Sequence, residues 1–429
     1  MRAAQRSTRI IVDVIIIGGG IGGLTLALTL HRAGVACRVF DQAPTMSALG
    51  VGINILPHAS RELGQLGLET ELARASVLTR EAAFFNRFGQ LIYREPLGRN
   101  AGYDDPQYSI HRGVLQQVLA AAVAERLGAD AIVTGWKCAG VDQDDRAAVA
   151  RFVDPATNAA RPAQRAAVVV ACDGLHSAVR KQLHPTEGAP LYSGVNMWRG
   201  TTRWAPIEGG ACMIRAGWLA TGKMVIYPIR NDVDGTGRQL VNWVAELETP
   251  RYRKRDWNRP GDLADFLHAF ADWHFDWLDV PAFLRAADAV LEFPMVDQDP
   301  LPFWTQGRVT LLGDAAHPMV PRGSNGAGQA ILDARALADS LVAHPDPREA
   351  LAAYEAVRRP FTANVVRMNR ANPPDAILRE VWSRTGDKPF ASVDDVISRE
   401  ELAALSDGYK RVAGFARAQL AATGAAATK

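Results

Sequence analysis

Residues 13–41 constrain the fold more than any other stretch of the chain. They read DVIIIGGGIGGLTLALTLHRAGVACRVFD: a β-branched apolar run, glycines in G-x-G-x-x-G spacing, a helical apolar pattern and a second apolar run. In that spacing Gly18 permits a tight turn, Gly20 lets the backbone approach a pyrophosphate, and Gly23 lets the helix pack closely on the strand. The stretch therefore predicts a βαβ unit with a dinucleotide-binding site at the start of its helix.

The ends of this unit carry the binding groups. The first turn of the helix, at Ile21 and Gly22, would present free N–H groups and the positive end of the helix dipole to phosphates. Asp41, at the end of the second strand, would accept hydrogen bonds from a ribose. The alternative is a glycine-rich turn in an ordinary α/β domain. The framing by two strands, a helix and a terminal acid favours the dinucleotide site.

Length and composition exclude several classes of protein. The 429 residues suffice for two or three domains with a large core. The net charge of +2 gives no reason to expect a nucleic acid or a membrane surface as partner. Four widely spaced cysteines without a C-x-x-C pair predict reduced core residues, no metal site and a cytoplasmic protein. The basic N-terminus lacks the apolar stretch of a secretory signal, and no run approaches the ~20 apolar residues of a membrane helix.

Two further stretches place glycine or polar residues beside predicted elements. Gly52 begins a strand-like GINI segment, and closely spaced glycines there suit a backbone that passes a flat ligand. Arg112 and Gln116 lie four residues apart on a predicted helix and so share one face, for which a solvated polar face is the alternative. Residues 81–94 alternate like a β-hairpin.

Two more strand–turn–helix junctions follow later in the chain. A buried strand ends in a CDG turn at Asp173, before a helix that begins near Ser177. Another strand, at residues 309–312, leads to a GD turn at Asp314, a proline-rich loop and a helix from about Gly326. Each junction alone is a weak signal, because acid–glycine turns are common.

Residues 197–293 have a different character. Strand-like segments dominate, and eight of the ten tryptophans lie between Trp198 and Trp304. We expect a separate, mainly antiparallel sheet that covers the dinucleotide domain, and an aromatic-rich face of such a sheet could hold a planar ligand. For any single tryptophan the alternative is simple packing of sheet against helix. Residues 256–278 have a helical pattern.

Three motifs in this order resemble the FAD-dependent aromatic hydroxylases of the para-hydroxybenzoate hydroxylase type. They are G-x-G-x-x-G at residues 18–23, the D-G motif at Asp173, and G-D-A-A-H-P at residues 313–318. The resemblance covers about residues 10–370. The family's P-x-x-G-Q-G loop departs here to PRGSNG, at residues 321–326.

Several phrases also resemble the phenazine-modifying branch, typified by 5-methylphenazine-1-carboxylate 1-monooxygenase. They read LGVGINI, PQYSIHRG, MWRG, LVNWV and PMVDQDPLP. They do not fix the substrate, because the side chains of a pocket diverge faster than such framework phrases.

The resemblance implies an α/β fold, in which a Rossmann-like FAD-binding domain has an inserted, mainly antiparallel β-sheet substrate domain and a C-terminal helical segment. The expected boundaries are residues 10–80, 105–190 and 295–370 for the discontinuous FAD-binding domain, 81–104 and 191–294 for the substrate domain, and 371–429 for the helical segment.

By the same resemblance, one set of residues would bind FAD, and NADH or NADPH would bind transiently without a dinucleotide fold of its own. The FAD-binding set is Gly18, Gly20, Ile21, Gly22, Gly23, Asp41, Gly52, Arg112, Gln116, Asp173, Asp314, Gly326 and Ala327. Candidates for the substrate pocket are Arg199, Tyr227, Trp243, Pro321 and Arg322. His317 lies in a framework motif and is interpreted as structural, so no catalytic acid or base is assigned.

The implied reaction is the hydroxylation of a small aromatic or heteroaromatic molecule, for example a phenazine. NAD(P)H would reduce the flavin, O2 would add at C4a, and the hydroperoxide would transfer one oxygen atom. Helix N–H groups at residues 326–328 would face the negative charge of the reduced flavin, and the apolar loop 317–321 would exclude water. Two alternatives stay open: a flavin-dependent reductase or dehydrogenase without oxygen transfer, and a non-catalytic FAD-binding protein. The chain has no W-x-W-x-I-P motif, which argues against a halogenase.

Overall fold

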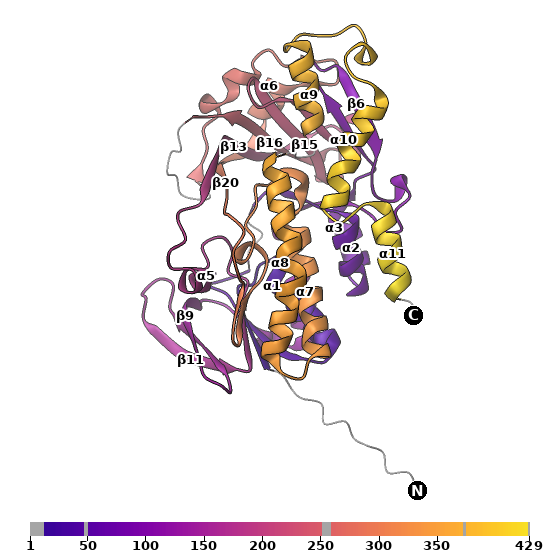
Figure 1. The fold of residues 1–429 in the computed structure, drawn as a ribbon. Coiled ribbons are helices and arrows are strands. Elements are labelled where there is room, and N and C mark those ends of the chain that lie inside the picture. The colour runs from indigo at the N-terminus through magenta and orange to yellow at the C-terminus, as the bar shows by residue number, and fades with distance from the viewer. Residues whose placement is uncertain (1–12, 47–49, 251–258, 372–374, 428–429) are drawn as a thin grey trace.

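The computed structural model describes residues 13–46, 50–250, 259–371 and 375–427. Two large sheets lie one above the other in Figure 1, and long helices run beside both. The basic N-terminal segment, residues 256–258 of the predicted helix and the last two residues of the alanine-rich tail lie outside the described residues.

The first sheet contains the predicted βαβ unit. β1 (Asp13–Ile17), α1 (Ile21–Ala33) and β2 (Ala36–Phe40) follow one another, and β1 pairs with β2 in parallel. The six strands have the order β21-β22-β12-β1-β2-β8, with β21 alone antiparallel. The other four are β8 (Ile132–Val133), β12 (Val168–Ala171), β21 (Thr305–Gln306) and β22 (Val309–Leu311). A parallel sheet is covered on both faces, and β12 is fully buried as expected.

Helices and two small sheets cover this sheet. α1 packs on α4 (Arg112–Leu127) and α7 (Gly326–Ala343), and α7 packs on α8 (Pro347–Ala371). α5 (Ala178–Leu183) packs on a three-stranded sheet of β9 (Lys137–Gln143), β10 (Ala148–Val153) and β11 (Ala160–Ala166). The second small sheet joins β3 (Gly52–Ile55), β7 (Tyr108–His111) and β4 (Ser76–Leu78), near α2 (Pro57–Gln65) and α3 (Glu69–Ala75).

The second large sheet is mainly antiparallel, as predicted. Its order is β17-β20-β13-β16-β15-β14-β5-β6, and only β14 and β5 pair in parallel. The predicted hairpin at residues 81–94 forms β5 (Glu81–Phe85) and β6 (Leu91–Pro96). The other strands are β13 (Leu191–Trp204), β14 (Cys212–Trp218), β15 (Gly222–Arg230), β16 (Gln239–Glu248), β17 (Arg259–Pro260) and β20 (Ala287–Asp297). Trp198, Trp243 and Trp273 are buried in a core on one face of this sheet.

The helical prediction for residues 256–278 is wrong for its described part. Single 3-10 turns form at Leu263–Asp265 and Leu267–Phe270, followed by a small hairpin of β18 (His274–Phe275) and β19 (Leu278–Asp279) and by α6 (Val280–Arg285). The phenylalanines and tryptophans of this stretch still point inward, because short turns bring them onto the second sheet. The spacing of the aromatic residues in this stretch therefore indicated that they are buried, and not that the stretch is a helix.

The C-terminal helices pack on the body of the protein. α9 (Ala376–Thr385) contacts β14 and β5, α10 (Arg399–Val412) contacts α8 and α9, and α11 (Arg417–Ala427) follows. In Figure 1 these helices are the golden to yellow elements, with α9 at the top, α10 below it and α11 at the right.

A buried cluster of charged residues connects the N-terminus of α9 to the second large sheet. The Lys223 ammonium lies 3.0 Å from the Glu246 carboxylate and 2.5 Å from that of Asp375, and Arg215 lies 3.2 Å from Asp375. Burial would raise the pKa of Asp375, but the adjacent Lys223 and Arg215 charges outweigh it and lower the pKa. Removal of either cation would leave a buried carboxylate uncompensated.

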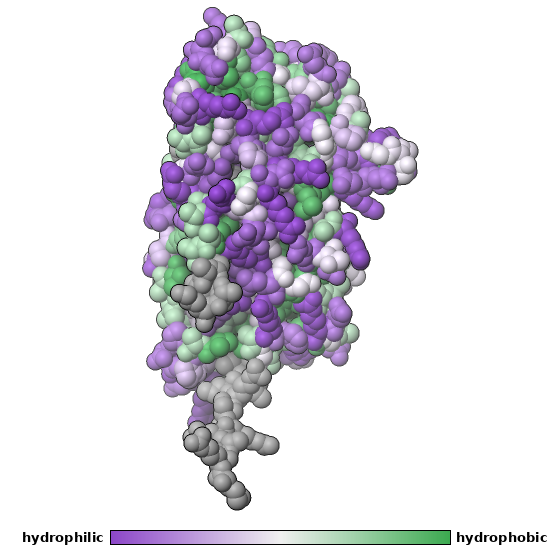
Figure 2. Space-filling model, turned by 90° about the vertical axis from the view of Figure 1, so that its right-hand side faces the viewer, coloured by the Kyte–Doolittle hydropathy of each residue, from purple (hydrophilic) through white to green (hydrophobic). Residues whose placement is uncertain are grey.

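The surface, the cysteines and the potential metal ligands bear on the expectations drawn from composition. Hydrophilic residues dominate the face shown in Figure 2, and apolar residues form small separate patches there. Each cysteine is free of disulfides. Within the described ranges, no helix combines the length and apolar character that crossing a bilayer requires, and no three potential metal ligands cluster.

We predict that the stability of the fold decreases below about pH 6.5 because of His58. Its ring is buried, neither ring nitrogen has a hydrogen-bond partner among the described residues, and burial, with a smaller effect of Arg358, lowers the pKa to about 3. The unfolded chain binds this proton more readily, so the free energy of unfolding falls as the pH falls between about 6.5 and 3. Between about pH 7.5 and 5.5 His58 should account for ~1.4 kcal/mol.

Urea unfolding at both pH values checks this prediction, with His58→Gln as comparison. The variant should lose that part of the pH dependence. An identical pH dependence in both proteins would contradict the assignment to His58.

Candidate functional site

A cavity of about 330 Å³ lies between the two large sheets, where the first turns of α1 and α7 meet β3 and the strands β13, β15 and β16. Eleven residues of the two predicted sets line it: Gly20, Ile21, Gly22, Gly52, Arg112, Arg199, Tyr227, Asp314, Pro321, Gly326 and Ala327. The structure therefore brings together residues from six separate stretches of the chain, at positions 20–22, 52, 112, 199, 227 and 314–327.

The three motif glycines have different environments. A Cβ at Gly18, whose φ is +103°, would overlap the carbonyl of Cys172, and a Cβ at Gly23 would overlap the carbonyl of Gly18. A Cβ at Gly20 would meet no described atom within 4 Å. Gly18 and Gly23 are thus required for the packing of the chain on itself, whereas Gly20 leaves space on the cavity side.

Two predicted cofactor residues hold this turn in place from outside the cavity. The Gly19 N–H donates to Asp41 Oδ2 at 2.6 Å, and Gln116 Nε2 donates to the Gly19 carbonyl at 2.6 Å. The turn is therefore fixed from both sides at the start of α1.

The starts of two helices point their N–H groups at this cavity. α1 contributes Ile21 and Gly22, and α7 contributes Gly326 and Ala327. Each helix start carries about half a positive charge, and the Arg112 guanidinium adds a full one. This end of the cavity suits an anionic ligand.

Side chains of the second large sheet form hydrogen bonds with the backbone of Gly52 in β3. Its carbonyl accepts hydrogen bonds from Arg199 Nη2 and from the Tyr227 hydroxyl, both at 2.8 Å, and its N–H donates to Asn242 Oδ1 at 2.7 Å. Burial raises the pKa of Tyr227, so the hydroxyl stays a donor, and burial lowers the pKa of Arg199. A side chain at position 52 would clash with Asn242.

The sheet end of the cavity carries both apolar and polar side chains. Val225, Val244 and Met197 line it from the strands, and Met319 lines it from the proline-rich loop. Its polar side chains are those of Arg199, Tyr227 and Glu246, and the Glu246 carboxylate is paired with Lys223.

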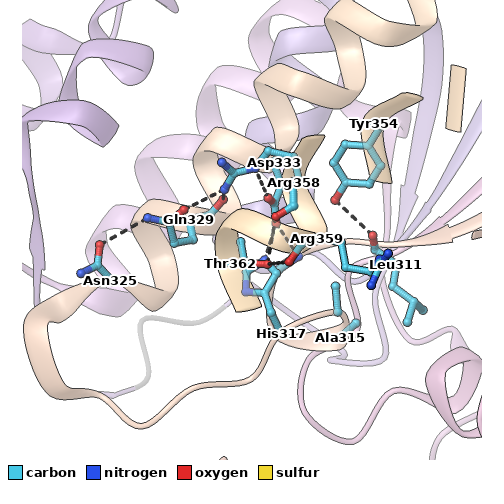
Figure 3. A network of polar contacts seen from close by, with 12 residues as sticks. Leu311, Ala315, His317, Asn325, Gln329, Asp333, Tyr354, Arg358, Arg359 and Thr362 are labelled. Carbon is cyan, nitrogen blue, oxygen red and sulfur yellow. Dashed lines mark hydrogen bonds and ion pairs between the residues drawn. The ribbon is translucent and has the colours of Figure 1, made fainter. Parts of the chain in front are cut away.

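The G-D-A-A-H-P motif is supported by a buried network (Figure 3). Asp333 Oδ2 lies 2.5 Å from His317 Nε2 and accepts from the Gly313 N–H at 3.1 Å, while Oδ1 accepts from Arg358 Nε at 2.7 Å. Burial would raise the pKa of Asp333, but the charges of His317 and Arg358 outweigh it and lower the pKa. The geometry agrees with the interpretation of His317 as structural.

The helix that follows the D-G motif also supports the G-D-A-A-H-P turn. Arg180 Nη1 donates to the carbonyls of Ala315 at 2.9 Å and Ala316 at 3.0 Å. Asp173 Oδ2 accepts from the Ala178 N–H at 3.0 Å, its buried Oδ1 has no partner among the described residues, and burial raises its pKa.

Two of the residues predicted for the substrate pocket, Trp243 and Arg322, do not line the cavity. Trp243 packs in the core on the opposite face of the second sheet, and its Nε1 donates to Thr202 Oγ1 at 3.0 Å. Trp243 pairs with Gly200 in the sheet, whereas Arg199 pairs with Val244, so alternation along β16 turns Trp243 away from the cavity. The Arg322 side chain is also absent from the cavity lining, although its neighbour Pro321 is present.

Sequence reasoning missed Asn242, Val244 and Glu246. They alternate on one face of β16 with Trp243 between them. The alternation was visible in the sequence, but the register against β13 that would have chosen the face was not.

Comparison with known proteins identifies the family. A family model described as an FAD binding domain matches residues 11–231 and 293–369, more than half of the chain. Phenazine 1,6-dicarboxylic acid hydroxylase PhzS of Lysobacter antibioticus is 41% identical over 404 residues, which are 93% of this chain and 97% of that protein. The chain belongs to the family of FAD-dependent aromatic hydroxylases.

A second relative is similar in sequence, and two solved structures are similar in fold. 3-Amino-4-hydroxybenzoate 2-monooxygenase PtmB3 of Streptomyces platensis is 34% identical, over 83% of this chain and 86% of that protein. Klebsiella pneumoniae HpxO, solved with FAD and uric acid, superposes with a TM-score of 0.75 at 21% identity, covering 93% of this chain and 96% of that one. A salicylate hydroxylase substrate complex gives 0.72 at 22% identity, covering 95% and 96%.

The residues of this hydroxylase fit FAD. Ile21 and Gly22 would hold the pyrophosphate, with the open side of Gly20 leaving room for it. Asp314 would accept from hydroxyl groups of the cofactor, and Gly326 with Ala327 would donate N–H groups at its other end. The cavity thus offers donors for the anionic part and an acceptor for hydroxyls.

We predict that Gly20→Val removes FAD affinity without unfolding the protein. The added side chain enters space that no described atom fills, so the melting temperature of the flavin-free protein should stay close to that of the wild type. The FAD Kd should rise at least about tenfold. Gly23→Val is the matched control, because it overlaps the Gly18 carbonyl and should destabilise the fold itself. Unchanged FAD affinity in Gly20→Val would contradict the site.

We also predict that Asp333→Asn destabilises the protein by ~3 kcal/mol or more, because Arg358 would lose its buried partner. Asp339→Asn, in the exposed pair with Arg335 on the same helix, should change stability by less than about 0.5 kcal/mol. Urea unfolding measures both. Equal effects of the two substitutions would contradict the role of the network.

Proposed function

We propose that this hydroxylase uses NAD(P)H and O2 to hydroxylate a planar, polycyclic heteroaromatic substrate of the phenazine type. One observation carries the proposal: a single cavity joins the donor-rich starts of α1 and α7 to a sheet face that presents apolar side chains with polar groups beside them. The 41% identity to a phenazine dicarboxylic acid hydroxylase over 93% of the chain supports the substrate class.

The chain's own residues would prepare the reaction. Bound FAD supplies the activation of O2 and the transfer of oxygen to the ring. The N–H groups of Gly326 and Ala327, with the dipole of α7, stabilise negative charge at the cofactor end. Val225, Val244 and Met319 exclude water from the sheet end.

The polar groups at the sheet end orient the substrate. Tyr227 and Arg199 are held on the Gly52 carbonyl, so they form a rigid edge of the pocket. Glu246 is held by Lys223 and leaves a carboxylate facing the cavity as a hydrogen-bond acceptor for the substrate.

The test is NAD(P)H consumption in air by the FAD-loaded protein, with and without phenazine carboxylates, hydroxybenzoates, aminobenzoates and quinolones. We expect one phenazine to accelerate consumption strongly and to gain one oxygen atom from ¹⁸O₂. Acceleration with a product that gains no ¹⁸O would instead indicate a reductase or dehydrogenase. FAD binding without NAD(P)H consumption on any ligand would indicate a non-catalytic flavoprotein.

We predict that Val244→Phe raises the KM for the accepted aromatic about tenfold, because the added ring fills the apolar end of the cavity. FAD content and the NAD(P)H consumption measured without substrate should not change. Val357→Phe, at a valine with 66% exposure on α8, is the matched control. An unchanged KM in Val244→Phe would place the substrate elsewhere.

A further inference from the structure

The loop before α7 forms a thin wall between two cavities. Ser324 lines the main cavity on one side and a second cavity of about 50 Å³ on the other. The second cavity is also lined by Ser406, Tyr409 and Lys410 of α10 and by side chains of β5, β6 and β14. Because the loop has a cavity on each side, close packing against neighbouring atoms alone does not hold it in place.

The backbone of this wall is in an unfavourable conformation. Gly323 has a φ of +77° and Ser324 a φ of +57°. Left-handed geometry is accessible to glycine but costly for serine, and persists where surrounding contacts impose it. The loop therefore requires partners from outside itself.

Tyr409 of α10 supplies those contacts. Asn325 Nδ2 donates to the Tyr409 hydroxyl at 2.7 Å, and the hydroxyl is 2.8 Å from Asn369 Oδ1, to which it donates. The ring lies directly against Gly323, where a Cβ would overlap the Tyr409 hydroxyl. Tyr409 is 4% exposed, so no water competes freely for these bonds.

The end of α10 also contacts the first turn of α7. Gln329 Nε2 donates to the Ala413 carbonyl at 3.3 Å, and Gln329 Oε1 accepts from Arg358 Nη2 at 2.7 Å. Arg358 in turn binds Asp333, so the contacts of α10 continue into the network of Figure 3. The last residue matched by the family model is 369, and α10 lies beyond it.

We propose that Tyr409 is a positioning residue for the FAD site: its hydroxyl fixes Asn325 and the wall at residues 321–325, and thereby the N–H groups at the start of α7. The proposal rests on the proposed function only in that FAD occupies the main cavity. The C-terminal segment thus completes the cofactor site without touching the cofactor.

Tyr409→Phe tests the proposal, because it removes the hydroxyl and keeps the ring. FAD binding to the full-length, flavin-free protein is titrated by flavin fluorescence, and the melting temperature is measured beside it. We expect the FAD Kd to rise about five- to tenfold, since the buried Asn325 amide loses the Tyr409 hydroxyl and keeps only the longer hydrogen bond to the Gly323 carbonyl, at 3.2 Å.

Tyr103→Phe is the matched control. The Tyr103 hydroxyl donates to the Phe415 carbonyl at 2.8 Å, in the same C-terminal segment, and lines neither cavity. It should lower the melting temperature as Tyr409→Phe does but leave the FAD Kd within about twofold. Equal effects of both variants on the FAD Kd would overturn the proposal, because Tyr409 would then act only through general stability.

Asn325→Ala removes the same hydrogen bond from the loop side. Its effect on the FAD Kd and that of Tyr409→Phe should not add in the double variant, because both disrupt one contact. Fully additive effects, or an unchanged FAD Kd in Tyr409→Phe, would overturn this proposal. As long as the wild-type protein binds FAD, these results would not affect the proposed function. A wild-type protein that binds no FAD would overturn the proposed function as well.

Discussion

The buried carboxylate of Asp333 is the group on which the arrangement of the site depends. It has no solvent exposure, and it binds His317, Arg358 and the Gly313 N–H at once. These partners come from the G-D-A-A-H-P turn and from α8, so one side chain of α7 joins three elements. A buried charge is tolerated only with such complete pairing. The network therefore fixes where α7 starts, and the start of α7 is one end of the cavity.

The other end of the cavity depends on a backbone group. Gly52 uses its carbonyl and its N–H on three side chains of the second sheet, Arg199, Tyr227 and Asn242. The small sheet that contains β3 is thus held to the second large sheet by hydrogen bonds of fixed direction. An apolar pocket with rigid polar edges follows from this geometry, and it suits a flat ring beside a flat cofactor.

Local signals in the sequence predicted much of this. The glycine spacing at residues 18–23 and the acid at Asp41 predicted the βαβ unit, because turn chemistry and periodicity are local properties. The patterns at residues 309–341 and 197–293 predicted the start of α7 and the mainly antiparallel second large sheet, and both are present. The residue-by-residue cofactor roles stay predictions.

Contacts between residues that are distant in the sequence could not be predicted from these local signals. Trp243 was placed in the pocket, but the face of β16 depends on its register against β13. Glu246 and Asn242 escaped notice for the same reason. The partners of Asp333 and Tyr409 lie far along the chain, and only the folded structure brings them together.

The most direct test is a crystal structure of the protein with FAD and the aromatic substrate that it accepts. The account predicts the pyrophosphate at the Ile21 and Gly22 N–H groups, the flavin at Gly326 and Ala327, and the substrate ring beside Val225 and Val244. A flavin away from the start of α7, or a substrate on the Trp243 face of the second sheet, would contradict it.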